Sequence, residues 1–147
     1  MEGSEAILGL RGVSRETQDR LAIYVGLLRR WNPAVNLVSQ ASLSAVWSRH
    51  ILDSIQVFDL APPARTWIDL GSGGGLPGMV IAIVAADERP DLAVTLVESD
   101  TRKCAFLSTV ARETGVAPRI EARRIEDLPP SVADIVSARA LAPLPRL

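Results

Sequence analysis

The feature that most constrains this chain is a run of glycines that directly follows a strand-like segment. Thr66 to Leu70 has the pattern of a short strand and leads without a break into Gly71 to Gly75. Pro77 then fits a first helical turn, and Met79 to Ala86 is continuously apolar. Glycines between a strand and a helix let backbone approach a ligand closely and turn helix N–H groups toward it. The pattern therefore predicts a ligand-binding strand–loop–helix unit.

The segments after this unit repeat the alternation of strand and helix. Ala93 to Glu98 has the pattern of a second buried strand, and Asp100 can cap a helix from Thr101 to about Thr114. Two more short strands are predicted, at Arg119 to Ala122 and at Ala133 to Ser137. This order is typical of an open parallel sheet in an α/β fold.

The part of the chain before residue 63 carries helical signals instead. Ser14 can cap a helix that Pro33 ends, and Ser42 can cap a second helix. We therefore divide the chain into an N-terminal helical extension, residues 1–62, and a sheet-forming, ligand-binding part, residues 63–147.

Composition and charge exclude several classes of protein. Sixteen basic and seventeen acidic residues give a net charge of -1, so the chain as a whole is not drawn to nucleic acid or to an anionic membrane. The single cysteine, Cys104, cannot form an internal disulfide and suits a reducing compartment. We expect no signal peptide and no metal-ligand cluster, and the sequence given has no apolar run near the ~20 residues that cross a bilayer. We expect a cytoplasmic protein without a metal or a membrane segment.

The glycine run admits two classes of ligand and one purely structural interpretation. Gly73 to Gly78 satisfies the dinucleotide fingerprint G-x-G-x-x-G, but that frame leaves Asp69 inside an apolar strand. The frame D-x-G-x-G-x-G, from Asp69 to Gly75, starts where the strand ends and resembles motif I of S-adenosylmethionine-dependent methyltransferases. A phosphate-binding P-loop is excluded because no lysine follows the glycines. In the structural interpretation the glycines form only a tight turn.

Carboxylates and basic residues near the predicted loops are the other candidates for ligand binding or catalysis. Glu98 stands at the end of the second strand, where a carboxylate can accept both ribose hydroxyls of an adenosine; we prefer it to Asp100 for that reason. His50 shares a helix face with Asp53 and Ser54, in a structural hydrogen-bond cluster or as a catalytic base.

Two further groups of arginines have alternative interpretations. Arg49 can pair with Asp53 at i, i+4 or contact a phosphate. Arg119, Arg123 and Arg124 form a local basic cluster that can face RNA phosphate or line an ordinary solvated rim.

Six short motifs occur in a fixed order along most of the chain, from about Leu21 to Leu144. They are Leu28-Arg29-Arg30-Trp31-Asn32, Asn36-Leu37-Val38-Ser39, Arg49-His50-Ile51-Leu52-Asp53-Ser54, the glycine run ending Leu76-Pro77-Gly78, Arg102-Lys103-Cys104-Ala105-Phe106-Leu107, and Ser137-Ala138-Arg139-Ala140. Together they resemble the bacterial small-subunit ribosomal RNA guanine-N7 methyltransferases, the RsmG (glucose-inhibited division B) family.

The resemblance implies a class I, Rossmann-like methyltransferase domain that uses S-adenosyl-L-methionine and methylates guanine N7 of 16S ribosomal RNA within the small ribosomal subunit. It implies cofactor contacts in four places: the glycine loop, the end of the second strand, the segment after the third strand, which lies beside the adenine, and the mouth of the active site after the fourth strand. These are Gly71, Gly73, Leu76, Glu98, Ile125, Glu126 and Arg139. The sheets of this family continue past the fourth strand, so we expect the parallel sheet of this chain to be incomplete at its C-terminal side.

The chemistry of this reaction explains why no catalytic triad is needed. Guanine N7 is a bare acceptor with a free lone pair, so its attack on a sulfonium methyl requires no general base. Catalysis then depends on positioning and on electrostatic support. The alternatives are an inactive cofactor- or ribosome-binding fragment and an NAD-binding oxidoreductase domain.

Arg139 gives the sharpest test of the resemblance. An arginine at the end of a buried strand has little structural reason to be there, so we expect Arg139→Ala to abolish methyl transfer to ribosomal subunits while the fold survives. Transfer of tritium from labelled methyl donor, with circular dichroism for the fold, checks this. Retained turnover would show that Arg139 is wrongly placed.

Overall fold

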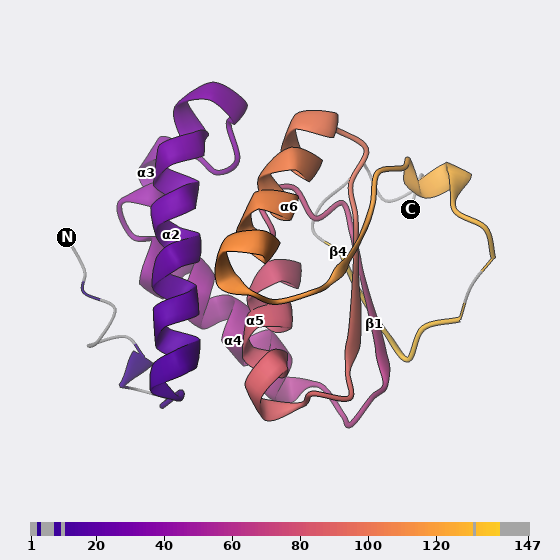
Figure 1. Cartoon of the computed structure of the whole chain (residues 1–147), viewed down its shortest axis with the longest axis horizontal. Coiled ribbons are helices and arrows are strands. Elements are labelled where there is room, and N and C mark those ends of the chain that lie inside the picture. Colours follow the sequence, from indigo (N-terminus) through magenta and orange to yellow (C-terminus); the bar gives the residue numbers. More distant parts are fainter. Residues whose placement is uncertain (1–2, 4–7, 10, 131, 139–147) are drawn as a thin grey trace.

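The structure, a computed structural model, describes residues 3, 8, 9, 11–130 and 132–138. Its helices and strands alternate after an all-helical first part (Figure 1). In chain order they are α2 (Arg15–Val35), α3 (Gln40–Leu43), the π-helix η1 (Trp47–Ile51), α4 (Leu52–Leu60), β1 (Thr66–Leu70), α5 (Gly78–Glu88), β2 (Ala93–Val97), α6 (Thr101–Thr114), β3 (Arg119–Glu121), the 3₁₀ turn η2 (Ile125–Asp127) and β4 (Ile135–Ala138).

The four strands form one parallel sheet in the order β3-β2-β1-β4. Thr66 of β1 pairs with Ala93 of β2, and Trp67 pairs with Ile135 of β4. Because the strands are parallel, the loops after all of them gather at one edge, the carboxyl edge. The predicted α/β fold with a parallel sheet is confirmed.

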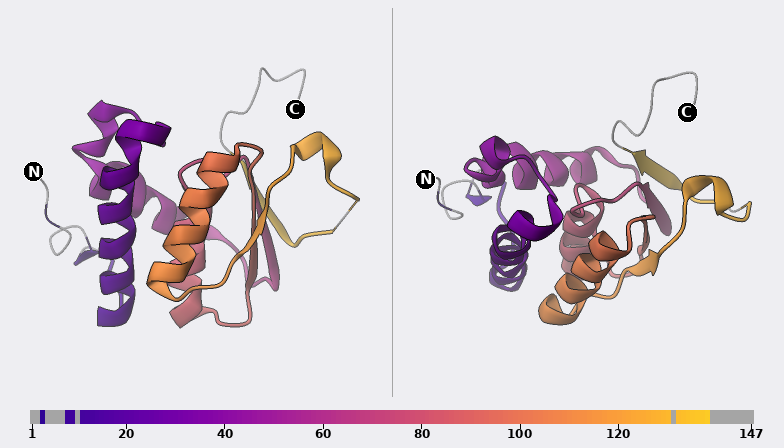
Figure 2. Two further views of the ribbon diagram at one scale, coloured as in Figure 1. Left: turned by 45° about the horizontal axis from the view of Figure 1, so that its top comes forward. Right: turned by 90° about the horizontal axis from the view of Figure 1, so that it is seen from above.

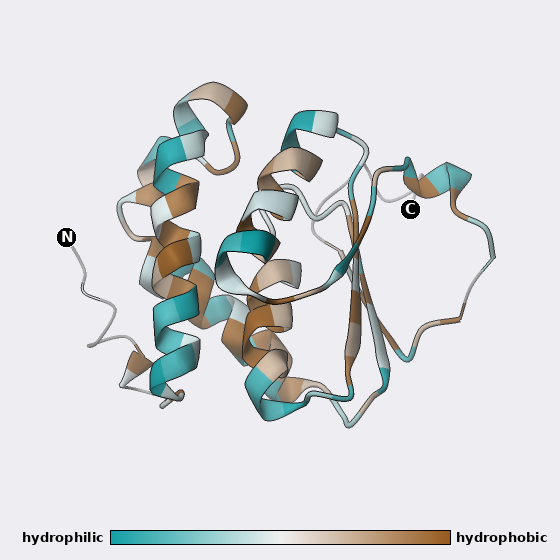
Figure 3. Ribbon diagram, viewed as in Figure 1, coloured by the Kyte–Doolittle hydropathy of each residue, from teal (hydrophilic) through white to brown (hydrophobic). Residues whose placement is uncertain are grey.

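The helices stand in layers on one side of the sheet. Figures 1 and 2 show α5 and α6 against the sheet, α2 outside them and α4 running beside α5, while the segment that contains η2 lies on the other side. Figure 3 shows α5 as almost entirely hydrophobic, and its residues from Gly78 to Ala85 are all buried. A helix that is apolar all round has to be covered on all sides, so the N-terminal helices and the sheet share one hydrophobic core.

Two predicted helix starts are confirmed by their capping hydrogen bonds. Ser14 Oγ accepts the Thr17 N–H at 3.1 Å, and Asp100 Oδ1 accepts the N–H groups of Arg102 and Lys103 at 2.8 and 3.1 Å. These bonds satisfy N–H groups that a helix cannot pair internally.

The prediction that Pro33 ends the first helix is wrong, because α2 continues to Val35. A proline in the last turn removes a single hydrogen bond, and Asn32 and Asn36 fix the end instead. Asn32 Oδ1 accepts the N–H of Leu37 at 2.7 Å, and Asn36 adopts the left-handed conformation with φ 58°.

The second predicted helix start, at Ser42, is also wrong. Ser39 is the cap, and its Oγ accepts the Ser42 N–H at 3.1 Å at the start of the four-residue α3. The longer helix begins only after a turn and opens with the π-helix η1, in which the Leu52 N–H bonds to the Trp47 carbonyl. This hydrogen bond spans five residues, one more than in an α-helix, and the spacing of apolar residues in the sequence does not reveal the difference.

Arg11 ties the chain before α2 to the ends of two later helices. Its guanidinium donates to both carboxylate oxygens of Asp59 at 3.0 and 2.7 Å and to both of Glu88 at 2.6 Å. The hydrogen bond from Arg11 holds the pKa of Asp59 below its usual range, and the two carboxylates raise the pKa of Arg11. Bidentate pairs of this kind are the strong class of ion pair.

We expect Arg11→Ala to lower the free energy of unfolding at pH 7 by about 1–2 kcal/mol, because two carboxylates lose their shared donor. Since the folded pKa of Asp59 is lowered, its contribution is present above the unfolded pKa of about 3.9 and is lost as the pH falls through the folded pKa. The effect of the variant should therefore shrink in acid. Urea unfolding at pH 7 and pH 3 measures both.

Arg15→Ala is the matched control for this prediction. Arg15 pairs with Asp19 at 3.5 Å with both side chains largely exposed, so its loss should cost less than about 0.5 kcal/mol. Equal effects of the two variants would contradict the role of Arg11.

Candidate functional site

The glycine loop lies at the carboxyl edge of the sheet and is tied to the neighbouring strand. Gly71, Gly73 and Gly75 have φ values of 70°, 57° and 91°, which residues with a Cβ rarely adopt. The N–H groups of Gly71 and Ser72 both donate to the carbonyl of Val97, at 2.9 Å. Open α/β sheets bind their ligands at this edge.

One side of the loop packs against the helical extension and the other side is open. Tyr24 Oη donates to the Gly74 carbonyl at 2.5 Å, and a Cβ on Gly74 would lie 3.2 Å from the Cβ of Leu37. A Cβ on Gly73 would meet only the Gly71 carbonyl oxygen, at 3.9 Å. The open side at Gly73 therefore leaves room for a ligand to approach the backbone.

Glu98 stands directly beside this open side of the loop. It follows β2 and is 8% exposed. Its Oε1 accepts the Gly73 N–H at 2.7 Å, and its Oε2 accepts the Asp100 N–H at 2.9 Å. The structure thus brings Gly73 and Glu98, two predicted ligand contacts, into a single hydrogen bond.

Asp100, the alternative carboxylate, has another task. Its side chain caps α6, and the backbone hydrogen bonds from Lys103 and Arg102 hold its pKa below the usual range. This capping role favours Glu98 as the residue that meets a ligand.

The other predicted contacts surround the same edge of the sheet. Leu76 is 4% exposed and ends the loop. Ile125 and Glu126 lie in η2, which follows β3, and Glu126 pairs with Arg124 at 3.3 Å. Arg139 lies outside the residues that the structure describes.

The buried carboxylate of Asp69 organises the site. From the sequence, Asp69 was noted only as the first residue of the D-x-G-x-G-x-G frame. Asp69 is 1% exposed, and its Oδ2 accepts the Ser72 hydroxyl at 2.9 Å and the Gly78 N–H at 3.1 Å. Its Oδ1 accepts the Ser137 hydroxyl at 2.8 Å, and Ser137 Oγ accepts the Trp67 indole N–H at 2.9 Å. One carboxylate therefore connects β1, the glycine loop, the start of α5 and β4.

This network corrects one argument from the sequence. A carboxylate within an apolar strand counted against the dinucleotide frame, although Asp69 belongs to the predicted strand Thr66 to Leu70. The structure places Asp69 within β1. The carboxylate is tolerated there because it is hydrogen-bonded to several donors and lies near the N-terminus of α5. The only sequence signal for the network was the acid at the start of the glycine frame.

A pocket of about 930 Å³ lies next to this network, between the helical extension and β4. Ser137 belongs both to its lining and to the hydrogen bonds of Asp69. The lining residues are Arg49, His50, Asp53, Val57, Pro77, Val136, Ser137 and Ala138.

Three of the polar residues considered in the sequence, Arg49, His50 and Asp53, line this pocket. His50 is 9% exposed and Ser54 is fully buried on the following turn, while Arg49 and Asp53 are exposed. Among the ion pairs of the described residues, none joins Arg49 to Asp53. Arg49 lies in the π-helix η1, whose hydrogen bonds span five residues, whereas the expected i, i+4 pair assumes a regular α-helix.

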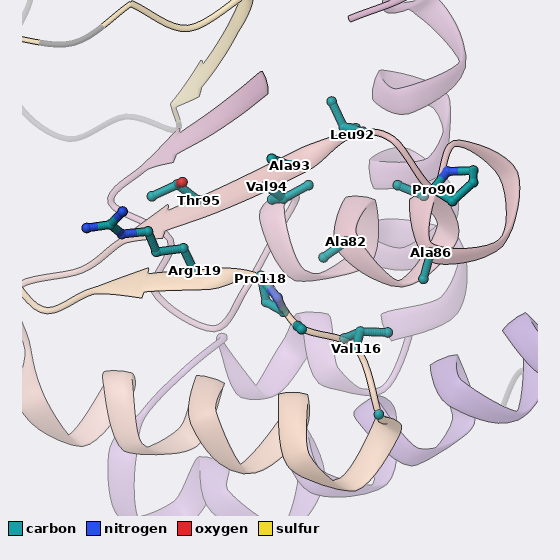
Figure 4. A pocket seen from close by; sticks show the side chains of 13 residues that line it. Ala82, Ala86, Pro90, Leu92, Ala93, Val94, Thr95, Val116, Pro118 and Arg119 are labelled. Carbon is teal, nitrogen blue, oxygen red and sulfur yellow. The ribbon is translucent and has the colours of Figure 1, made fainter. Parts of the chain in front are cut away.

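A second pocket, of about 520 Å³, lies away from the loop (Figure 4). It is lined by Ala82, Ala86, Val94 and other apolar residues where β2 and β3 begin, and Arg119 is its one charged lining residue. Without convergent polar groups, it lacks what fixes the orientation of a ligand.

The three arginines of the expected basic cluster form ion pairs with two neighbouring glutamates. Arg119 and Arg123 pair with Glu121 at 2.6 and 3.4 Å, and Arg124 pairs with Glu126. These ion pairs favour the solvated-rim interpretation over a contact with phosphate.

Within the described ranges, no three His, Cys, Asp or Glu side chains gather as a metal ion would require. No helix in the same part of the chain combines the length and the apolar character needed to span a membrane.

Comparison with known proteins gives one family. The family GidB, rRNA small subunit methyltransferase G, matches residues 17–147. The chain is 56% identical over 135 residues to ribosomal RNA small subunit methyltransferase G of Ruegeria sp. (strain TM1040), covering 92% of this chain and 66% of that protein. The corresponding protein of Cereibacter sphaeroides (strain ATCC 17029 / ATH 2.4.9) is 50% identical over 144 residues, with 97% and 70% covered. The chain thus spans about two thirds of the length of these relatives.

A solved structure supports the fold. It is a Plasmodium falciparum protein described as a protein-L-isoaspartate O-methyltransferase, in complex with S-adenosyl-L-homocysteine. The TM-score is 0.58 at 13% identity, covering 98% of this chain and 78% of the other. At this identity the likeness concerns the Rossmann-like methyltransferase fold alone.

Gly78 allows a test of the Asp69 network. A Cβ at Gly78 would collide with the carboxylate of Asp69 and lie 2.5 Å from Cδ2 of Leu96. We expect Gly78→Ala to lower the free energy of unfolding by about 1–3 kcal/mol, because buried groups must shift. Denaturant unfolding measures this.

Gly26→Ala is the matched control. Gly26 lies in α2 with nothing within 4 Å of its added Cβ, so alanine there should raise stability by up to about 1 kcal/mol. Opposite signs are expected for the two glycines, and equal effects would contradict the special position of Gly78.

Proposed function

This chain belongs to the GidB family, rRNA small subunit methyltransferase G, and on that premise we propose that it binds S-adenosyl-L-methionine and methylates guanine N7 in 16S ribosomal RNA. The substrate is the RNA within the small ribosomal subunit, in the cytoplasm. The observation that carries the proposal is the buried Glu98 carboxylate, hydrogen-bonded to Gly73 on the open side of the glycine loop. The names of the relatives and the S-adenosyl-L-homocysteine bound by the structural neighbour support it.

The residues around the loop fit this cofactor. A carboxylate at the end of the second strand accepts ribose hydroxyls, and Glu98 keeps unused acceptor capacity beside its two backbone donors. Gly71 and Gly73 admit the cofactor close to the backbone, and Leu76 adds apolar contact. In our proposal Ile125 and Glu126 lie beside the adenine, and Arg139 lies at the mouth of the active site.

The reaction needs positioning more than proton transfer. When bound, S-adenosylmethionine supplies a sulfonium methyl: the lone pair of guanine N7 forms the new N–C bond, while the S–C bond breaks and its electron pair stays on sulfur. No proton leaves N7, so the protein supplies no general base. Its task is to hold N7 in line with the methyl group and to exclude competing geometries. In our proposal the target base enters the pocket beside Ser137.

Exposed arginines near the carboxyl edge support an RNA substrate. Arg29 and Arg30 of α2 and Arg102 of α6 are exposed and take part in none of the ion pairs of the described residues. The two helices pack against each other through the edge-to-face contact of Trp31 and Phe106, with ring centroids 5.6 Å apart. Phosphates of an RNA are the ligands that such unpaired arginines bind.

The cofactor proposal is tested by calorimetry with S-adenosylhomocysteine. We expect Glu98→Ala to weaken its binding about 10- to 100-fold, because hydrogen bonds to a charged group contribute about 1.5–3 kcal/mol. Glu98→Gln, which keeps one acceptor oxygen, should fall between this variant and the wild type. Asp100→Ala should lower the melting temperature by removing the cap of α6, yet leave the affinity unchanged.

The outcome that sinks the proposal is tight binding of NAD with no binding of S-adenosylhomocysteine. Transfer of tritium from labelled methyl donor to unmethylated small ribosomal subunits then tests catalysis. A chain that binds S-adenosylhomocysteine and transfers no tritium is a binding fragment.

A further inference from the structure

The pocket between the helical extension and β4 has two chemically different walls. One wall, from η1 and α4, carries Arg49, His50 and Asp53. The opposite wall, from the start of α5 and from β4, carries Pro77 and Ser137 among small and apolar residues. At about 930 Å³ the pocket is large enough for a nucleoside. Asp53 supplies the one carboxylate among the described residues that line the pocket.

The polar groups of the second wall are already engaged. The Ser137 hydroxyl donates to Asp69 and accepts from Trp67. Asp53 and Arg49, by contrast, are exposed and share no ion pair with each other. A ligand that enters this pocket therefore meets a fixed second wall and an available carboxylate on the first.

The backbone under the charged wall departs from a regular helix. Arg49 and His50 lie within the π-helix, where the Leu52 N–H reaches back to the Trp47 carbonyl. Such π turns occur mostly as single turns within helices, frequently at functional sites. Arg49 lies in this turn and Asp53 just after it, and both line the pocket without forming an ion pair with each other.

The two edges of guanine match the two different walls of the pocket. Its N7 must face the methyl donor, and on the proposed function the donor lies on the glycine-loop side, beyond Pro77 and Ser137. The opposite, Watson–Crick edge of the base then faces the wall of Asp53. That edge of guanine presents two adjacent donors, N1–H and the N2 amino group, which a carboxylate accepts in pairs. Adenine presents an unprotonated N1 there, which a carboxylate repels.

We infer that Asp53 determines specificity for guanine by accepting hydrogen bonds from its N1–H and N2 amino group, with Arg49 balancing the charge of the bound nucleotide. This inference rests on the proposed function, because it takes the position of the methyl donor from it. It adds a residue that reads the base, on an element remote in sequence from the glycine loop.

The test is the binding of GMP, IMP and AMP to the protein loaded with S-adenosylhomocysteine, followed by NMR titration. IMP keeps N1–H and lacks the amino group, so it separates the two hydrogen bonds. We expect GMP to bind at least about fivefold more tightly than AMP, with IMP between them, as for one good bidentate contact to a base. In Asp53→Asn the GMP-to-AMP ratio should fall to within about twofold, because the amide presents a donor to the donors of guanine.

Asp91→Asn is the matched control, since it makes the same change at an exposed residue of the turn before β2, at the opposite edge of the sheet. It should leave the GMP-to-AMP ratio intact. A merely structural role of Asp53 would lower the binding of all three nucleotides and of S-adenosylhomocysteine together and leave the ratio unchanged.

Three results overturn the inference while the proposed function stands: equal affinity of the wild type for GMP and AMP, no GMP binding at millimolar concentration, or an unchanged ratio in Asp53→Asn, each with S-adenosylhomocysteine bound. Failure of the wild type to bind S-adenosylhomocysteine overturns the proposed function itself, and the inference with it.

Discussion

The buried carboxylate of Asp69 is the interaction on which the arrangement of the site depends. Its two oxygens accept from the Ser72 hydroxyl, the Gly78 N–H and the Ser137 hydroxyl, so one side chain fixes the glycine loop, the start of α5 and the fourth strand relative to β1. A buried charge is tolerated only when hydrogen bonds replace its lost water. Removing any one of these donors would therefore disturb all of the elements joined at the carboxyl edge.

The proposed cofactor side and the proposed substrate side of the site are joined to Asp69 in different ways. On the cofactor side, Glu98 and Val97 hold the loop against β2 through backbone donors, so the loop is shaped before a ligand arrives. Such preorganisation reduces what binding has to order. On the substrate side, Ser137 completes the wall of a pocket whose other wall comes from the helical extension. The extension thus contributes directly to the site, in addition to covering α5.

Local features of the fold were predictable because their causes are local. The strand before the glycines, the Asp100 cap and the parallel order of strands each follow from neighbouring residues or from simple rules of connection. Of the seven residues assigned to the cofactor, the structure brings Gly73 and Glu98 into direct contact, whereas Arg139 lies outside the described residues and its role stays a prediction.

The sequence by itself determined a strand–glycine loop–helix unit, a parallel sheet and an acid after the second strand, because periodicity, glycine conformation and capping act over a few residues. Only the tertiary structure decided what Asp69 does, since its bond to Ser137 joins groups 68 positions apart. The same holds for the hydrogen bonds from Arg11 to Glu88, 77 positions away. The π turn that contains Arg49 is likewise known only from the structure, because the spacing of apolar residues does not distinguish it from an α-helical turn.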